Sequence, residues 1–174
     1  MSPYFFSFMS GEENKTIKCA AIEAVLATGL LPADEQGVAH QWPLPLPAIL
    51  KIQFARKYFR TVYPTCIIAL LKNDNDVTLY LKCDEKDKPV TTLVLKKASL
   101  QDIACQLFPF GFVQTQRQSI INLHYFEGVD GDTLLLRTPI NNDIKIGASF
   151  EKQVTRLLDI YLRGKNCIDL FGNI

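Results

Sequence analysis

The chain has 174 residues, of which 48% are apolar and 21% are charged, and its 19 basic and 18 acidic side chains leave a formal net charge of +1. High hydrophobicity with little net charge excludes a mainly disordered chain. The same balance excludes a strongly basic protein that coats nucleic acid by charge alone. The length fits one domain with an appendage, or two very small domains.

The cysteines and histidines are too scattered to form a recognisable site. The five cysteines show no CxxC or other close pair and stand at positions 19, 66, 83, 105 and 167. A structural zinc site needs four closely spaced ligands, so we expect no metal and no other cofactor. An odd number of scattered cysteines is typical of reduced thiols in a cytoplasmic protein. The longest uncharged apolar run, residues 24–31, is too short to span a membrane, and Glu23 argues against a signal peptide.

Alternating prolines at residues 43–47 divide the chain. They exclude a helix and predict an extended connector. Residues 1–47 carry a net charge of −3, whereas residues 48–163 carry +4. The sequence therefore predicts an acidic helical extension with its connector (1–47), a moderately basic main domain (48–163) and a short tail (164–174).

The extension contains one predicted helix, residues 16–28, which Gly29 and Pro32 end. Apolar side chains recur at helical spacing, and Ile22 and Leu26 widen the apolar face. A face this apolar must be covered. Either the protein's own main domain or the same helix of a second chain could cover it, so a homodimer through this helix is one expectation.

The main domain is predicted to be mostly β-structure. Alternating or continuous apolar patterns predict nine strands, at residues 49–54, 66–71, 77–82, 91–95, 112–114, 119–123, 125–129, 133–137 and 144–146. The polar turn at residues 84–88 predicts a hairpin, and Asp130 with Gly131 predicts a tight turn into the strand that follows. The expected fold class is therefore mostly β with short helices, a helical extension before it and a terminal helix.

Two helices are expected within the main domain. Ser99 opens the first in a capping-box pattern with Asp102, and this helix ends near residue 107. Its inner side is formed by Leu100, Ile103, Ala104 and Leu107. The second covers about residues 149–163 and has Phe150, Val154, Leu157, Leu158 and Tyr161 on one side.

Common catalytic and phosphate-binding motifs are absent from the sequence. Neither GxGxxG nor GxxxxGK[ST] occurs, and there is no GxSxG nucleophile turn. His40 and His124 stand far apart, and we expect both to have structural roles. The loop carboxylates do not follow the spacing of a calcium loop. We therefore do not expect an enzyme.

One stretch resembles a known family. Residues 112–123 read FVQTQRQSIINL, which is similar to the signature of LytTR-family DNA-binding domains, where a Phe is followed by His-Arg-Ser-Tyr-Ile-Val-Asn. The similarity is carried by Phe112, Arg117, Ile120, Ile121 and Asn122. The order of strands and helices agrees over about residues 48–163.

The resemblance implies a bacterial transcription regulator with a mostly β domain, whose loops enter successive major grooves of duplex DNA. In such interfaces polar side chains read base edges while basic groups hold phosphates. Carried over by position, the loops are residues 73–76, 116–118 and 147–149. The implied DNA-binding residues are Asn75, Gln116, Arg117, Gln118, Lys145, Ser149 and Lys152.

A second function is left open: a LytTR-fold protein-interaction module that does not bind DNA. Asp74 and Asp76 make the first loop acidic and would repel a duplex, and the third loop lacks the arginines that are usual in the family. Both features favour this alternative, whereas the pattern of Phe112, Arg117 and Asn122 favours DNA binding. Asn122 is expected to bond nearby backbone. The alternative for Arg117 is an ordinary surface arginine or an internal ion-pair partner.

Overall fold

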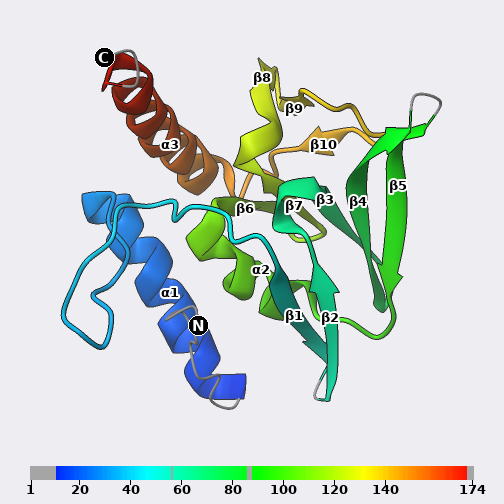
Figure 1. Ribbon diagram of the computed structural model, residues 1–174, viewed down its shortest axis with the longest axis horizontal. Coiled ribbons are helices and arrows are strands. Elements are labelled where there is room, and N and C mark those ends of the chain that lie inside the picture. Colours follow the sequence, from blue (N-terminus) through cyan, green and yellow to red (C-terminus); the bar gives the residue numbers. More distant parts are fainter. Residues whose placement is uncertain (1–10, 56, 86–87, 172–174) are drawn as a thin grey trace. The chain divides into compact units, whose positions relative to one another are not determined.

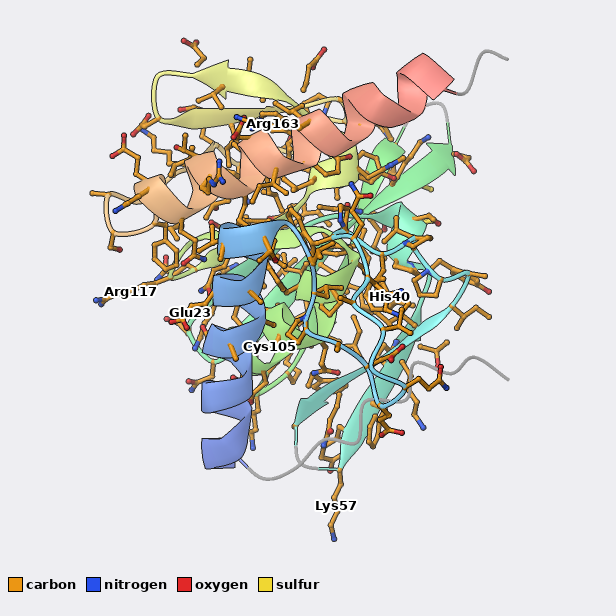
Figure 2. The ribbon with its side chains drawn as sticks, turned by 90° about the vertical axis from the view of Figure 1, so that its left-hand side faces the viewer. Glu23, His40, Lys57, Cys105, Arg117 and Arg163 are labelled. Atoms are coloured by element: carbon orange, nitrogen blue, oxygen red, sulfur yellow. The ribbon has the colours of Figure 1, made fainter. Side chains whose placement is uncertain are left out.

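The computed structural model describes residues 11–55, 57–85 and 88–171 (Figure 1). Contacts within the chain divide it into residues 1–41 and residues 42–174. The first unit contains helix α1 (Gly11–Thr28), which confirms the predicted helix and begins five residues earlier. Gly29 follows with a φ of 74°, a left-handed conformation that glycine adopts without strain. Glu23 lies exposed on α1 (Figure 2).

The second unit is built from three antiparallel sheets. The largest has the order β5-β4-β3-β7-β6, a smaller one the order β10-β9-β8, and β1 pairs with β2. Their bounds are β1 (Leu50–Ala55), β2 (Tyr58–Val62), β3 (Ile67–Asn73), β4 (Asp76–Glu85), β5 (Lys88–Leu95), β6 (Phe112–Gln116), β7 (Ser119–Asn122), β8 (Phe126–Asp130), β9 (Thr133–Leu136) and β10 (Ile144–Lys145). The prediction of a mostly β fold is confirmed.

The helices of this unit are α2 (Leu100–Leu107) and α3 (Glu151–Phe171). Of three short 3₁₀ turns, Pro64–Cys66 and Leu123–Tyr125 join strands, and Phe108–Phe110 joins α2 to β6. The Ser99 hydroxyl accepts a hydrogen bond from the Asp102 N–H at 3.2 Å, so the predicted cap of α2 is confirmed. No helix in the described part of the chain is both long and apolar enough to cross a membrane.

Two predictions from the sequence were wrong. Strand β2 was not expected, because four of its five residues are exposed and their side chains therefore show no alternation of apolar and polar character. The terminal helix was expected to end at Arg163, but α3 continues through Gly164 to Phe171. Glycine weakens a helix by only about 1 kcal/mol relative to alanine, which is too little to end a helix by itself.

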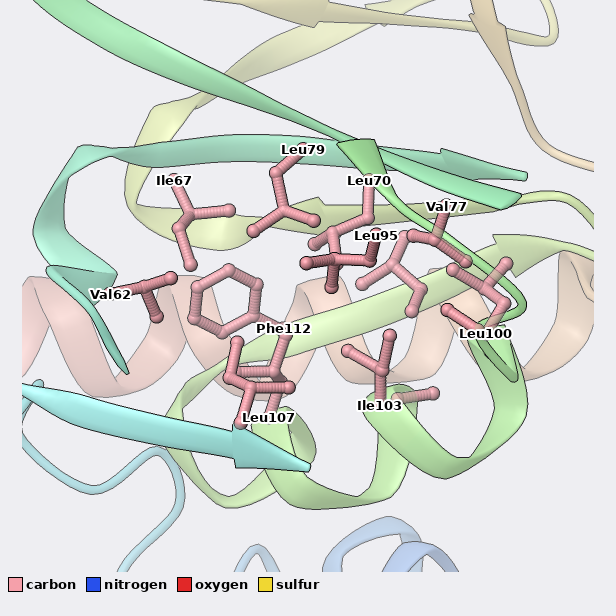
Figure 3. Close-up of a cluster of buried hydrophobic side chains, with 14 residues drawn as sticks. Val62, Ile67, Leu70, Val77, Leu79, Leu95, Leu100, Ile103, Leu107 and Phe112 are labelled. Carbon is pink, nitrogen blue, oxygen red and sulfur yellow. The ribbon is translucent and has the colours of Figure 1, made fainter. Parts of the chain in front are cut away.

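The core lies where α2 packs on the five-stranded sheet (Figure 3). All four residues of the predicted inner side of α2 are buried. They belong to a cluster with side chains from β3, β4, β6 and β7, among them Leu70, Leu79, Phe112 and Ile120. Each large apolar side chain buried in this way stabilises the fold by about 1.5–3 kcal/mol.

The proline-rich segment, residues 43–47, is free of helix as expected. Its start is bonded to the 3₁₀ turn Phe108–Phe110 through Trp42 and Leu44. The Trp42 ring stacks on Phe108 with centroids 5.3 Å apart, and its indole N–H donates to the Phe108 carbonyl at 2.7 Å. The Leu44 N–H donates to the Pro109 carbonyl at 2.8 Å. The start of this segment is therefore anchored to the turn that follows α2.

Candidate nucleic-acid interface

Two of the three loops implied by the resemblance lie at the same end of the five-stranded sheet. Strand β3 ends in the turn to β4, where Asn73 pairs with Asp76. It also pairs with β7, with Leu71 opposite Ser119. The Lys72 N–H donates to the Gln118 carbonyl at 2.8 Å. Residues 73–76 and 116–118 are therefore neighbours.

The third loop joins this group through Gly147. Its N–H donates to the Thr115 carbonyl at 2.9 Å, and its own carbonyl accepts from the Phe150 N–H at 2.7 Å as the chain turns into α3. A Cβ atom at Gly147 would lie 3.2 Å from the Gln116 Cβ, so glycine permits this close approach. The three loops thus converge, and we call residues 73–76, 116–118 and 147–149 the loop edge.

Most of the implied DNA-binding residues present their side chains to solvent at the loop edge. Arg117 and Gln118 are exposed in the β6–β7 turn, and Gln116 is half-buried beside them. Figure 2 shows Arg117 projecting from the molecule, and no ion pair holds its guanidinium within the residues described. The other exposed members of the set are Asn75, Ser149 and Lys152.

Lys145 differs from the other implied cations. It lies in β10, and its ammonium nitrogen is 3.3 Å from an Asp132 carboxylate oxygen. Both side chains are more than half exposed, at 55% and 60%. Such a surface pair contributes little to stability. The Asp132 carboxylate nevertheless offsets the positive charge that Lys145 could offer to a phosphate.

Beneath the exposed turn, the polar groups of the motif are buried and satisfied. The Thr115 and Ser119 hydroxyls are 2.7 Å apart and fully buried. The Asn122 amide donates to the Ile67 carbonyl at 2.8 Å, and its side-chain oxygen accepts from the His124 N–H at 3.0 Å. The expectation that Asn122 bonds nearby backbone is confirmed.

The structure adds two lysines that the sequence analysis missed. Strand β5 returns beside β4 with Leu95 opposite Val77, so Lys96 and Lys97 emerge next to the first loop. The Ala98 N–H donates to the Asn75 carbonyl at 3.0 Å. The hairpin predicted from the sequence could have indicated these two lysines, because its antiparallel register places the end of β5 opposite the start of β4.

The two acidic residues of the first loop behave differently. The Asp76 carboxylate lies 2.7 Å from the Lys96 ammonium and also accepts the Lys97 backbone N–H at 3.0 Å. These bonds, the one from Lys96 first, lower the pKa of Asp76 below its ordinary value. The interpretation that both carboxylates repel a duplex therefore needs correction: Lys96 neutralises Asp76, and of these two carboxylates only Asp74 forms no ion pair with a described residue.

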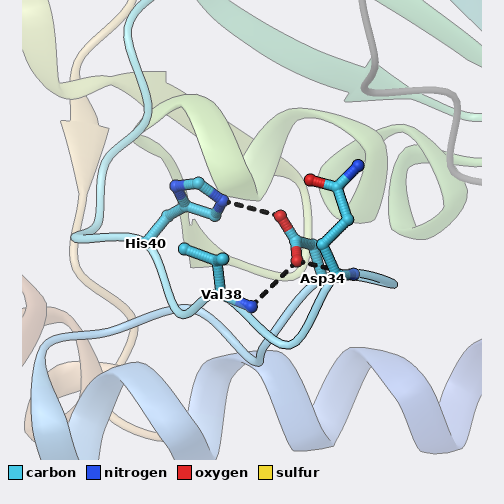
Figure 4. Close-up of polar contacts among 4 residues, drawn as sticks. Asp34, Val38 and His40 are labelled. Atoms are coloured by element: carbon cyan, nitrogen blue, oxygen red, sulfur yellow. Dashed lines mark hydrogen bonds and ion pairs between the residues drawn. The ribbon is translucent and has the colours of Figure 1, made fainter.

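Both histidines take part in local contacts within their own units. In the first unit, His40 Nε2 lies 2.9 Å from Asp34, whose other carboxylate oxygen accepts backbone N–H groups from Gln36 and Val38 (Figure 4). His124 lies edge-on to the Tyr125 ring, and partial burial lowers the pKa of His124. Within the residues described, no cluster of three or more His, Cys, Asp or Glu side chains could hold a metal ion.

Comparisons with known proteins gave similarity at the level of structure only. No protein-family model matches the chain. No curated protein matches it. Among solved structures, the chain is similar to a LytTr DNA-binding domain from Bacillus cereus, with a TM-score of 0.45 and 18% sequence identity over 64% of this chain and 97% of that domain. This is the family whose signature residues 112–122 resemble.

Proposed function

We propose that this protein is a bacterial, cytoplasmic transcription regulator that binds duplex DNA through the loop edge. The observation that supports this most is the convergence of three loops around an exposed arginine flanked by two glutamines. A guanidinium can bond guanine or a phosphate, and a glutamine amide can bond adenine through two hydrogen bonds. Arg117, Gln116 and Gln118 therefore offer both kinds of contact on one turn.

The small positive charge near the loop edge predicts modest affinity for duplex DNA. The exposed cations near it include Arg117, Lys97 and Lys152, and Asp74 opposes them. Each phosphate that a cation neutralises releases counterions, so the logarithm of the binding constant falls with the logarithm of salt concentration, with a slope of about −0.9 per contact. We expect a slope of about −3 for one copy of the chain.

The test begins by selecting duplexes from a random-sequence pool with the full-length protein and titrating the selected duplex at several salt concentrations. Arg117→Ala should weaken binding by about 1–3 kcal/mol if the guanidinium reads a base, and should relax the preference at that position. Its thermal stability should stay close to that of the wild type, because the side chain is exposed. The proposal is falsified if no duplex shows salt-sensitive binding.

Lys88→Ala is the matched control for charge. Lys88 is exposed and lies at the start of β5, opposite Glu85 in the strand register, at the end of the sheet away from the loop edge. Lys88→Ala removes one positive charge from the sheet that also carries Arg117. A general electrostatic attraction to DNA would therefore weaken equally in Lys88→Ala and Arg117→Ala. Specific contact at the loop edge predicts a large effect for Arg117→Ala and a small one for Lys88→Ala.

The β1–β2 hairpin supports the alternative function, a protein-interaction module. It exposes the aromatic side chains of Tyr58 (66%) and Phe59 (49%), and Tyr63 (62%) follows β2 directly. The Lys51 ammonium lies 4.5 Å from the Phe59 ring centroid. Exposed aromatic side chains beside cations are common in protein interfaces. This alternative predicts no salt-sensitive duplex binding. It also predicts a partner that Phe59→Ala releases and Arg117→Ala retains.

A second copy of the chain is a further proposed partner, through α1. In this helix Val25 is buried, Ile22 and Leu26 are half-buried, and Glu23 is exposed. A dimer would join two weak DNA contacts and raise their effective concentration on repeated sites. Sedimentation of the full-length protein should then show a dimer that Ile22→Glu dissociates and Glu23→Gln preserves. A wild-type protein that is monomeric at every concentration contradicts this proposal.

A further inference from the structure

Two cations, Lys97 and Arg117, lie on opposite sides of the first loop. Across the sheet the strands follow the order β5, β4, β3, β7, β6. Lys97 follows β5, the first loop joins β3 to β4, and Arg117 lies in the turn between β6 and β7. Neither Lys97 nor Arg117 forms an ion pair with another residue in the described ranges. The first loop is thus flanked by one positive charge on each side.

The spacing of the strands beside these cations is close to the width of the major groove of duplex DNA. Strands β5 and β7 are three strand spacings apart in this sheet. Neighbouring strands lie about 4.8 Å apart, which separates β5 from β7 by about 14 Å. The major groove of B-form DNA is about 12 Å wide between its two phosphate backbones. Cations at the two sides of the first loop can therefore reach both backbones while the loop faces the groove.

Lys97 is held in place by contacts with the first loop. It has a φ of 52°, a left-handed conformation that non-glycine residues rarely adopt. Its backbone N–H is bonded to the Asp76 carboxylate, which also pairs with Lys96. The next N–H, that of Ala98, is bonded to the Asn75 carbonyl. Asp76 is therefore a positioning residue that fixes where the Lys97 side chain leaves the backbone. Surrounding bonds that maintain an unusual backbone conformation often mark a functional site.

We propose that Lys97 and Arg117 straddle the major groove that the first loop faces, with the Lys97 ammonium on one phosphate backbone and the Arg117 guanidinium on the other. This inference rests on the proposed function. It also accounts for Asp74, whose carboxylate would face base edges, where it can accept a hydrogen bond from the amino group of cytosine. On a phosphate the same carboxylate would be repelled.

The test maps phosphate contacts strand by strand. The duplex selected by the full-length protein is ethylated at random phosphates, and the positions where ethylation prevents binding are read on each strand. The wild-type protein should show blocked phosphates on both strands, facing each other across one major groove. Lys97→Asn should lose the signal on one strand, and Arg117→Ala should lose it on the other.

Lys97→Asn is chosen because asparagine tolerates the left-handed conformation and is neutral. It should weaken binding about three- to tenfold for every sequence and reduce the magnitude of the salt slope by about 1. Lys97→Arg should restore both the affinity and the blocked phosphates. Lys88→Asn, at the opposite end of β5, should change neither. Thermal unfolding of each variant establishes that the fold is retained.

The outcomes separate this inference from the proposed function. If Arg117→Ala weakens binding while Lys97→Asn leaves the salt slope and the blocked phosphates unchanged, the straddling arrangement is wrong and DNA binding stands. If both variants lose blocked phosphates on the same strand, the straddling arrangement is again wrong. If no duplex is selected at all, the proposed function fails and this inference fails with it.

Discussion

The two halves of the segment that resembles the LytTR signature have opposite surroundings. Phe112, Ile120 and Asn122 are almost completely buried, whereas Arg117 and Gln118 are exposed in the turn between β6 and β7. The buried half packs into the core and bonds β7 to the chain at the start of β3 through Asn122. The exposed half is free to contact a partner. A resemblance carried mainly by buried residues therefore indicates the fold more directly than it indicates what the protein binds.

The departures from the signature show the same division. Gln116 and Gln118 stand where the family has His and Ser, and both lie in or beside the exposed turn. Ser119 stands where the family has Tyr, but it is buried, and its hydroxyl is bonded to Thr115. Arg117 is the residue of the signature that both matches the family and is exposed. It is therefore the position at which recognition can be tested without disturbing the fold.

The largest effect on stability is expected from the buried half. Phe112→Ala removes a ring that packs with Leu107 and Ile120 in the main core cluster. The free energy of unfolding should fall by about 3–5 kcal/mol, because a cavity remains where the ring was. Urea denaturation measures this fall. Gln118→Ala, six residues later and exposed, is the control and should change stability by less than about 0.5 kcal/mol.

A smaller but still large effect is expected for Asn122→Ala. The substitution leaves the Ile67 carbonyl and the His124 N–H without the bonds they make to the side chain. A buried polar group that loses its partner costs about 1–3 kcal/mol, and the partly buried His124 N–H costs less than the fully buried Ile67 carbonyl, so the free energy of unfolding should fall by about 2–4 kcal/mol. If the variant is as stable as the wild type in urea, the amide has no structural role, and its place in the resemblance needs another reason.

Much of this fold could be predicted because most strands are half-buried or buried and show it in their residue pattern. Strand β2 could not, since its exposed face has no apolar alternation. Only the family resemblance named the three loops as one set, and their convergence was not predicted, because residues 73–76 and 147–149 are far apart in sequence. Lys97 was missed because its place depends on the register of the β4–β5 hairpin, which charge patterns do not determine.

The buried hydroxyl pair at the base of the turn provides an intermediate effect. Thr115→Val or Ser119→Ala alone leaves the other hydroxyl without its buried partner, so each should lower the free energy of unfolding by about 1–3 kcal/mol. The double variant should cost less than the sum of the two, because no unsatisfied hydroxyl remains. A double-mutant cycle in urea measures this coupling. Additive effects would show that the two hydroxyls do not depend on each other.

The smallest effect concerns the ion pair between Asp76 and Lys96, which lies beside Lys97, and it depends on pH. The pKa of Asp76 is lowered in the folded protein, chiefly by its bond from Lys96, so the folded state favours the ionised carboxylate. The stability that this provides is complete above the unfolded pKa of about 3.8 and is lost as pH falls through the folded pKa below it. Thermal unfolding between pH 7 and pH 3 should therefore show a weaker acid dependence for Asp76→Asn than for the wild type. Lys96→Met breaks the same pair from the other side and should weaken the acid dependence in the same direction. If both variants follow the wild-type curve, the pair of Asp76 and Lys96 does not stabilise the fold. Lys97 must then be held by the backbone bond from the Ala98 N–H to the Asn75 carbonyl.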